Sequence, residues 1–373
     1  MPSTFPDEAR GAAHRAAVWL LRSQERSGGD GSSAFYMPLY GWAAPYPETT
    51  GYIVPTLWRC ADVFGEATFS AGAERMAAWL VGLQAPEGWF PGGTLARNAT
   101  RRPSVFNTGQ ILFGLIEAEA RTGDAAYGTS ARRAVDWLVE TQGADGRWRE
   151  GAYRSGPQPS YYAHVCWPMA LYLRRHGGDD VRRGIVRALD AILEDRTPQG
   201  TFRHWAFAPG KPAFTHTIAY TLQGLVESAR LLDRWEPYGR AAAESGERLL
   251  RRFEVGKRLA GAYDEAWTGR FWYACLTGHC QIASTWLALH RLAGDPRFLN
   301  AAIKAFRFVA ERQASGLVAP QARGAIAGSS PPFGRYMAFR YPNWAAKFFI
   351  DAALDLADDV ESLDAAPAGA AGG

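Results

Sequence analysis

Three histidines and a tyrosine stand in segments that otherwise carry few polar groups. His164, His216 and His279 each lie near the start of a mostly apolar stretch, and Tyr220 follows His216 by four residues. Histidine and tyrosine exchange protons readily, so we expect acid/base catalysis by His216 and Tyr220, with His164 assisting. Glu48 has a similar position and is a further catalytic candidate, although a carboxylate there could equally cap its own helix.

Aromatic, amide and arginine side chains gather at the same segment starts and in the loops before them. Flat aromatic faces suit sugar rings or polyprenyl chains, while amides and guanidinium groups orient hydroxyl, carboxylate or phosphate groups. The residues that we expect to bind substrate are Tyr52, Asn107, Gln110, Tyr162, Trp205, Trp272, His279, Gln281, Arg340, Asn343 and Trp344.

The adjacent pair His279 and Cys280 raises the question of a metal site. Neighbouring residues of a helix point about 100° apart, so the two side chains cannot both face one point. Cysteines within apolar helical patterns are usually packed groups, and the four cysteines include no CxxC pair. We therefore expect no metal and no other cofactor, unless His164, His216 and His279 meet across the fold.

The elements that must position these residues are helices arranged in pairs. In each pair, one segment is charged on one face and the other is nearly free of charge. The charged segments are 6–26, 67–84, 125–142, 179–195, 236–256 and 295–314, and their partners begin near 48, 106, 161, 215, 277 and 341. Uncharged helices must be enclosed by the charged ones. The sequence therefore predicts an all-α (α/α)6 toroid of six helical hairpins and twelve helices.

The connecting segments predict where a site would lie. The chain returns from an uncharged helix by short turns, whereas it enters one through long loops rich in Gly, Pro and aromatic residues. The long loops and the first turns of the inner helices then share one face, the mouth, whose free N–H groups favour anions. We expect one domain over residues 1–357 and a disordered tail over 358–373.

Composition excludes several classes of function. The net charge of +4 is spread along the chain, without the dense basic run of a nucleic-acid-binding protein, so no nucleic-acid partner is expected. No stretch of about 18 uncharged apolar residues is present, so we expect no transmembrane segment. The first residues lack the order of regions found in a signal peptide, which predicts a cytoplasmic protein.

Repeated motifs suggest a family of folds. The segment QGADGRW (142–148) resembles the Q-x3-G-x-W repeat of triterpene cyclases, QAPEGWF (84–90) is a near match, and weaker echoes begin at Gln24 and Gln313. In such a repeat the glutamine ties one hairpin to the next, while the tryptophan packs on its own hairpin. The architecture is similar to that of terpenoid cyclases and protein prenyltransferases, and of six-hairpin glycan enzymes.

A closer resemblance is to bacterial toroid proteins linked to exopolysaccharide biosynthesis. It rests on the segments YPETTGY (46–52), FNTGQ (106–110), HTIAYT (216–221), LTGHCQIA (276–283) and YPNWAAKFF (341–349). The resemblance implies a setting in bacterial polysaccharide biosynthesis, with a glycan or a lipid-linked sugar as the partner.

Four functions remain open at this point. Lyase or epimerase chemistry on an acidic sugar is our leading hypothesis, because it needs the acid, base and neutralising groups of the predicted mouth. A glycosidase would need two carboxyls, such as Glu48 with Asp264 or Glu265. An isoprenoid-processing enzyme is the alternative, although the DxDD acid motif of class II terpene cyclases is missing. A toroid that only binds a glycan is the fourth.

The first prediction concerns the two proposed proton-transfer residues. Substituting His216→Ala or Tyr220→Phe should abolish turnover and leave the melting temperature nearly unchanged, because a catalytic group contributes little to the core. Thermal unfolding and an activity assay on the same preparations test this expectation. Full activity in both variants would refute the assignment.

Overall fold

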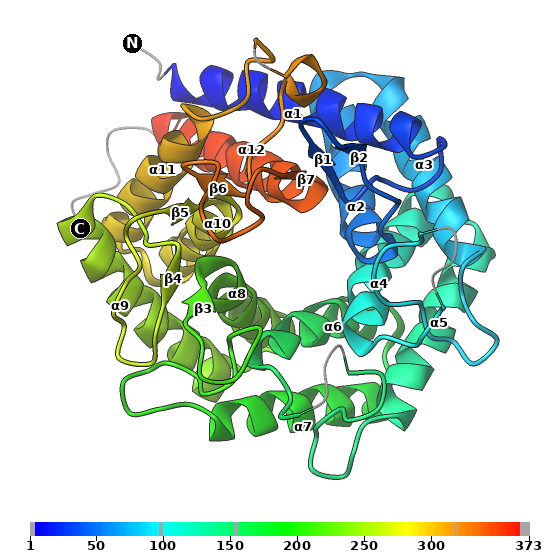
Figure 1. Cartoon of the computed structure of the whole chain (residues 1–373). Coiled ribbons are helices and arrows are strands. Elements are labelled where there is room, and N and C mark those ends of the chain that lie inside the picture. The colour runs from blue at the N-terminus through cyan, green and yellow to red at the C-terminus, as the bar shows by residue number, and fades with distance from the viewer. Residues whose placement is uncertain (1–3, 97–99, 153–155, 318, 366–373) are drawn as a thin grey trace.

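The computed structural model describes residues 4–96, 100–152, 156–317 and 319–365. These residues form a ring of helices in two concentric layers (Figure 1). The outer layer contains α1 (Phe5–Arg26), α3 (Ala67–Val81), α5 (Ala125–Glu140), α7 (Asp179–Glu194), α9 (Arg240–Gly256) and α11 (Pro296–Ala310). The inner layer contains α2 (Pro47–Phe64), α4 (Val105–Thr122), α6 (Ala163–His176), α8 (Thr215–Leu231), α10 (Leu276–Ala293) and α12 (Asn343–Ala365). The predicted (α/α)6 toroid of twelve helices is confirmed for the described residues.

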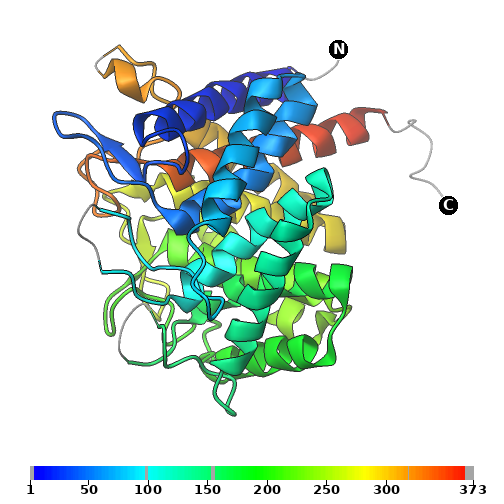
Figure 2. The same ribbon diagram turned by 90° about the vertical axis from the view of Figure 1, so that its right-hand side faces the viewer.

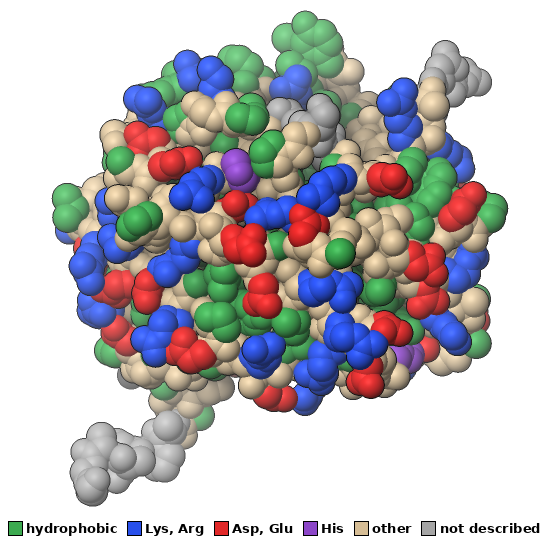
Figure 3. Space-filling model, turned by 90° about the horizontal axis from the view of Figure 1, so that it is seen from below, with side chains coloured by type: hydrophobic (Ala, Val, Ile, Leu, Met, Phe, Trp, Pro, Cys, Tyr) green, Lys and Arg blue, Asp and Glu red, His purple; other side chains and the backbone are tan. Residues whose placement is uncertain are grey.

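Side-chain burial separates the two layers as the sequence pattern requires. In the outer helix α7, Val181, Ile185, Ala188 and Ile192 recur at helical spacing on the one buried face. The inner helix α8 instead buries fifteen of its seventeen residues. On the outer wall seen in Figure 3, Lys and Arg are interspersed with Asp and Glu. The outer helices therefore carry the solvated surface, and the inner helices fill the ring.

Glycines allow neighbouring inner helices to pack closely. A Cβ atom on Gly278 of α10 would lie 2.7 Å from the backbone nitrogen of His216, at the start of α8. A Cβ atom on Gly224 of α8 would lie 2.3 Å from the carbonyl carbon of Ala163, at the start of α6. Because only glycine permits such approaches, the register between neighbouring inner helices is fixed near the mouth.

Four glutamine side chains each tie one hairpin to the next outer helix. The amide of Gln142 donates to Gly146 of its own loop (3.2 Å) and to Gly184 of α7 (3.0 Å). The amides of Gln24, Gln84 and Gln313 make the equivalent pairs of bonds. Gln313 reaches Ala12 of α1 and so joins the last hairpin to the first. The role predicted for glutamine in the repeat is confirmed.

Trp148 of the same repeat packs as predicted. It is buried, and its indole N–H donates to Leu138 of its own hairpin at 2.8 Å. The tryptophan of the full Q-x3-G-x-W match is therefore part of the hairpin and not of the mouth.

The long loops meet on one side of the ring and the short turns on the other (Figure 2). Short strands connect loops that come from different hairpins. They form the sheets β2-β1-β7, β3-β4 and β5-β6. The strands are β1 (Phe35–Met37), β2 (Gly41–Trp42), β3 (Ala213–Phe214), β4 (Ala262–Tyr263), β5 (Ala274–Cys275), β6 (Ser329–Ser330) and β7 (Tyr341–Pro342), and three short helical turns cover Ser160–Tyr162, Trp235–Gly239 and Pro320–Ala322.

The C-terminal segment differs from the sequence-based expectation. Helix α12 continues to Ala365, so residues 358–365 of the segment expected to be disordered are helical, while 366–373 lie outside the described residues. Arg10 of α1 accounts for the extension, because it contacts Asp358 at 3.0 Å and also pairs with Glu361. No described helix is long and apolar enough to cross a membrane.

The glutamine ties generate a stability prediction. Gln142→Ala should lower the free energy of unfolding by about 1–3 kcal/mol, because the carbonyls of Gly146 and Gly184 lose their donor. Gln199→Ala is the matched control, since Gln199 is exposed and its side chain makes no hydrogen bond within the described residues. Urea unfolding measures both variants. Equal losses in the two would contradict a structural role for the ties.

Candidate functional site

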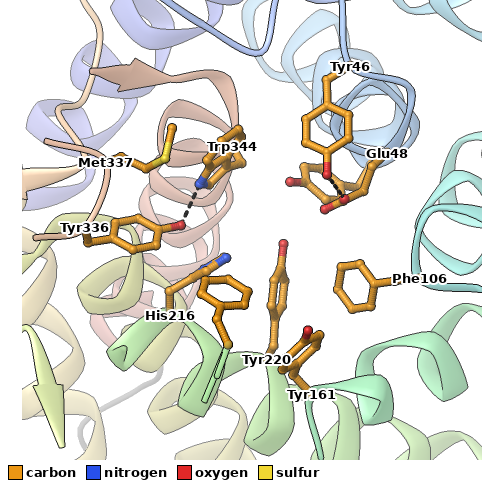
Figure 4. A pocket seen from close by; sticks show the side chains of 11 residues that line it. Tyr46, Glu48, Phe106, Tyr161, His216, Tyr220, Tyr336, Met337 and Trp344 are labelled. Carbon is orange, nitrogen blue, oxygen red and sulfur yellow. Dashed lines mark hydrogen bonds between the residues drawn. The ribbon is translucent and has the colours of Figure 1, made fainter. Parts of the chain in front are cut away.

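A pocket of about 240 Å³ opens at the mouth, on the axis of the ring. Eight of its eleven lining residues are aromatic, and the other three are a carboxyl, an imidazole and a thioether. The lining residues are Tyr46, Glu48, Tyr52, Phe106, Tyr161, Phe207, His216, Tyr220, Tyr336, Met337 and Trp344. The pocket is therefore an aromatic chamber in which Glu48, His216 and five tyrosine hydroxyls are the titratable groups (Figure 4).

His216 stands in the first turn of α8 on one wall of this pocket (Figure 4). Its Nδ1 lies 2.7 Å from Oε1 of Gln281, an acceptor that fixes the proton on Nδ1 and leaves the Nε2 lone pair free. Burial lowers the pKa of His216 to about 4. The imidazole is therefore neutral at neutral pH and can act as a base.

Glu48 stands in the first turn of α2 on the opposite wall (Figure 4). The hydroxyl of Tyr46 donates to its carboxylate. Burial raises the pKa of Glu48 to about 7, although the bond from Tyr46 opposes the shift. Tyr46, the N-cap residue of α2, makes no side-chain capping bond, and Glu48 lies in the first turn, where a carboxylate also interacts favourably with the helix N-terminus. A substantial part of the Glu48 population carries a proton at neutral pH.

Tyr220 lies between these two groups, with its hydroxyl directed into the pocket (Figure 4). It is one helical turn beyond His216, and the two ring centroids are 4.3 Å apart. Burial raises the pKa of Tyr220 well above its usual range, so the phenol keeps its proton. The nearby Tyr52 phenol is protonated for the same reason. Tyr220 therefore presents a protonated hydroxyl to the pocket between the two walls.

His164 lies behind Tyr220 and does not line the pocket. Its ring centroid is 4.5 Å from that of Tyr220, and its Nδ1 is 2.7 Å from Oε1 of Gln110. Burial lowers the pKa of His164 well below its usual range, helped by the charge of Lys347. Gln110 thus supports His164 in the way that Gln281 supports His216.

His279 does not face the mouth, and that prediction was wrong. Its Nδ1 donates to the Cys275 carbonyl (2.8 Å), its Nε2 accepts from Leu259 N–H (3.2 Å), and its ring stacks on Phe308. Helix α10 is rotated so that Gln281, and not His279, faces α8. Among the described residues, no cluster of three His, Cys, Asp or Glu side chains could hold a metal.

Four other predicted binding residues lie in the protein interior instead of the pocket. The side-chain amide of Asn107 donates to Pro91 O, and that of Asn343 donates to Ser32 and Thr49. Tyr162 is buried against Phe106, and Trp205 against Trp267. These side chains make contacts within the protein and do not line the pocket in this structure.

Trp272 and Arg340 lie on the rim of the mouth, outside the pocket. Trp272 is half exposed and packs on Tyr273, while the guanidinium of Arg340 lies over the ring of Phe35. The carboxyls considered as glycosidase partners are also absent from the lining: Asp264 accepts the N–H groups of Ala266 and Thr268 in its own loop. Glu48 is therefore the one carboxyl among the lining residues.

The pocket also contains residues that were not among the predicted binding residues. Tyr46 and Phe106 are the first residues of the segments YPETTGY and FNTGQ. Their positions at the inner-helix starts could therefore have identified them as pocket residues. Phe207, Tyr336 and Met337 come from long loops that lack periodicity. The remaining lining residue, Tyr161, precedes α6.

A second cavity of about 350 Å³ lies at the other end of the axis. Ion pairs dominate its lining, including Arg59 with Asp355 (2.7 Å) and Lys347 with Asp351 (2.6 Å). Tyr52 lines both cavities and is itself buried. Its ring therefore separates the aromatic mouth pocket from a charged cavity behind it.

The architecture is that of the α/α toroids, a class that includes enzymes acting on sugars. No family model matches the chain. A heparin-specific unsaturated glucuronyl hydrolase superimposes with a TM-score of 0.75 at 14% identity, covering 95% of this chain and 98% of that one. Cellobiose 2-epimerase from Spirochaeta thermophila gives 0.74 at 15% identity, covering 97% and 100%. Cellobiose 2-epimerase from Bacillus thermoamylovorans gives 0.75 at 11% identity, covering 95% and 99%.

One sequence similarity is to an enzyme of a different kind. The chain is 30% identical over 105 residues to ent-copalyl diphosphate synthase from Streptomyces sp. (strain KO-3988). The match spans 28% of this chain and 19% of the length of that relative. It therefore concerns a part of the toroid and not the whole protein.

The buried carboxyl of Glu48 generates a stability prediction. Because its folded pKa lies above the ordinary value, the folded chain binds this proton more tightly, and stability falls as pH rises from about 4.5 to about 7. Glu48→Gln removes this loss. The variant should exceed the wild type in unfolding free energy at about pH 8 by on the order of 2–4 kcal/mol, and match it near pH 4.

Chemical denaturation at the two pH values measures the difference. Glu265→Gln, which removes an exposed loop carboxyl, is the matched control and should change stability little at either pH. Equal stability of Glu48→Gln and the wild type at about pH 8 would show that Glu48 is not held in a desolvated site.

Proposed function

We propose that this protein is a sugar epimerase that moves a proton at the carbon next to a carbonyl group. The observation that carries the proposal is the pairing of a neutral, oriented His216 with a proton-bearing Glu48 on opposite walls of one aromatic pocket. Such a proton transfer needs a deprotonated base and a protonated acid at the same pH.

The reaction divides between the two walls. Nε2 of His216 removes the proton from the carbon beside the carbonyl, and the Glu48 carboxyl gives its proton to the carbonyl oxygen, so that a neutral enediol forms. Return of a proton to the opposite face of that carbon, from the Tyr220 hydroxyl, gives the epimer. As the carbon takes this proton, the oxygen-bound proton returns to the Glu48 carboxylate and the carbonyl re-forms. The proton held on Nε2 of His216 then passes to the Tyr220 oxygen, so that all three groups regain their starting states.

The pocket lining favours this reaction over the related ones. Hydrolysis by the common mechanism needs two carboxyls, and Glu48 is the one that the lining provides. Elimination from an acidic sugar needs a cation or amide to neutralise the sugar carboxylate, and neither Lys, Arg, Asn nor Gln is among the lining residues. The reacting sugar unit in our proposal is therefore uncharged, with its faces against Tyr46, Phe106 and Trp344.

The structural neighbours support the same proposal at the level of the fold. Two of them are cellobiose 2-epimerases, which superimpose over nearly the whole chain. The identities of 11–15% do not carry any residue role from one protein to the other. The assignment of His216, Glu48 and Tyr220 therefore rests on their geometry in this chain.

A second candidate is an isoprenoid-processing enzyme. It is favoured by the aromatic lining, by a single proton-bearing carboxyl and by the partial similarity to ent-copalyl diphosphate synthase. A volume of about 240 Å³ lies below the roughly 300–1,000 Å³ typical of small-molecule sites, which suits a sugar unit better than a polyprenyl chain. Among the residues that the structure describes, no Lys or Arg lines the pocket to hold a diphosphate.

The epimerase proposal predicts proton exchange with a defined pH dependence. In D2O, reducing mono- and disaccharides should gain deuterium at the carbon beside the carbonyl, which NMR detects. The rate at low substrate concentration should rise as His216 loses its proton, near pH 4, and fall as Glu48 loses its proton, near pH 7.

Variants test the assignment of the two walls. His216→Ala and Glu48→Gln should each reduce exchange by at least about 100-fold, whereas Glu265→Gln should exchange like the wild type. Exchange that survives in Glu48→Gln would refute the role of Glu48. Absence of exchange in the wild type, together with conversion of geranylgeranyl diphosphate, would favour the isoprenoid candidate.

A further inference from the structure

The rim of the mouth carries large apolar side chains that point into solvent. Leu39 is 100% exposed, Tyr40 81%, Phe333 58% and Phe339 55%. We call these four residues the rim patch. Leu39 and Tyr40 form the tip of the hairpin between β1 and β2, which projects beyond the ring in Figure 2. Exposed apolar groups collected on one feature mark a surface that is covered when the protein works.

The two segments of the rim patch are held together as one feature. Strand β1 pairs with β7, with Phe35 opposite Pro342 and Tyr36 opposite Tyr341. Phe339 N–H donates to Pro332 O at 2.7 Å and so closes the loop that carries Phe333. Between hairpin and loop lies a cavity of about 280 Å³, which Leu39, Tyr40 and Phe339 help to line. The rim patch is therefore one continuous surface formed by two adjoining segments.

Arginines accompany the rim patch. Arg340 lines the same cavity and lies over the ring of Phe35, and Arg335 lies over the ring of Trp272. The described residues place no carboxylate within salt-bridge distance of either guanidinium. Arginines elsewhere, such as Arg10, Arg59 and Arg121, are paired. Two cations beside the apolar tips are thus free to meet an anionic partner.

The net charge of the whole mouth face is positive, like that of these arginines. The six long loops (27–46, 82–104, 141–159, 195–214, 257–275 and 311–342) contain sixteen Lys or Arg and eight Asp or Glu. The rest of the chain contains twenty-five and twenty-nine. The mouth face is therefore basic, while the remainder of the molecule is slightly acidic.

We propose that the mouth face docks on an anionic lipid bilayer. Apolar tips inserted at the boundary between headgroups and acyl chains, together with arginines at the phosphate level, are the two elements of peripheral membrane binding. Tyr40 and Trp272 supply the aromatic groups that favour this interface. The aliphatic Leu39 has no flat face for a sugar ring, so a lipid surface explains the patch better than an acidic polysaccharide does.

Docking in this orientation turns the mouth pocket toward the membrane. If the proposed function holds, the sugar that reaches the pocket is one carried at the membrane surface. The docking itself does not depend on the reaction, so the two proposals can fail separately.

Vesicle flotation of the full-length protein tests the docking. With vesicles of equal parts phosphatidylglycerol and phosphatidylcholine at low salt, the protein should float with the lipid. Pure phosphatidylcholine should bind far less, and added salt should release the protein. Leu39→Ser/Tyr40→Ser should weaken binding by at least about tenfold, and Arg335→Gln/Arg340→Gln by roughly 25-fold, at about fivefold for each charge.

The matched controls remove similar groups from the opposite face. Leu292→Ser replaces an exposed leucine at the end of α10, and Arg174→Gln/Arg183→Gln removes two arginines. Both should float like the wild type, and circular dichroism should show that every variant is folded. The proposal is overturned if the folded wild type does not float with anionic vesicles. It is equally overturned if the rim variants and the controls float alike, or if the protein binds polygalacturonate and not vesicles.

Discussion

Closure of the ring is the constraint on which the rest of the structure depends. None of the hairpins can cover its own inner helix, so each must be fixed to its neighbour at a set rotation. The amides of Gln24, Gln84, Gln142 and Gln313 contribute this fixation, and Gln313 spans the junction between the last hairpin and the first. Arg10 adds a second tie across the junction. The convergence of the inner-helix first turns follows from this closure.

The convergence of the inner helices places His216 and Glu48 in one pocket, where burial shifts their pKa values in opposite directions. Loss of water around His216 disfavours its cation, while loss of water around Glu48 disfavours its anion. Near neutral pH His216 is therefore uncharged and able to accept a proton, while a substantial part of the Glu48 population is protonated and able to donate one. The aromatic lining is consequently more than a surface for substrate, because it sets the protonation state of both walls.

Helical periodicity predicted the ring, since six charged segments that alternate with six uncharged ones fit a closed ring of outer and enclosed helices. It also placed His216, Tyr220, Glu48, Tyr52 and Trp344 at the mouth, because they stand at inner-helix starts. Periodicity does not predict how each helix is rotated about its own axis. It therefore did not show that His279 faces the protein interior while Gln281 faces His216. Lining residues from the loops, such as Phe207 and Tyr336, depend on pairing between loops that no local pattern encodes.

Tyr52 lies on the axis of the toroid, between the mouth pocket and the charged cavity. Because the Tyr52 ring stands between the mouth pocket and the charged cavity behind it, the axis of the ring is a blind well and not a tunnel. Whatever enters must leave by the same opening, and a long chain cannot be threaded through. In the proposed function, a polymer would therefore present only its terminal unit to the pocket.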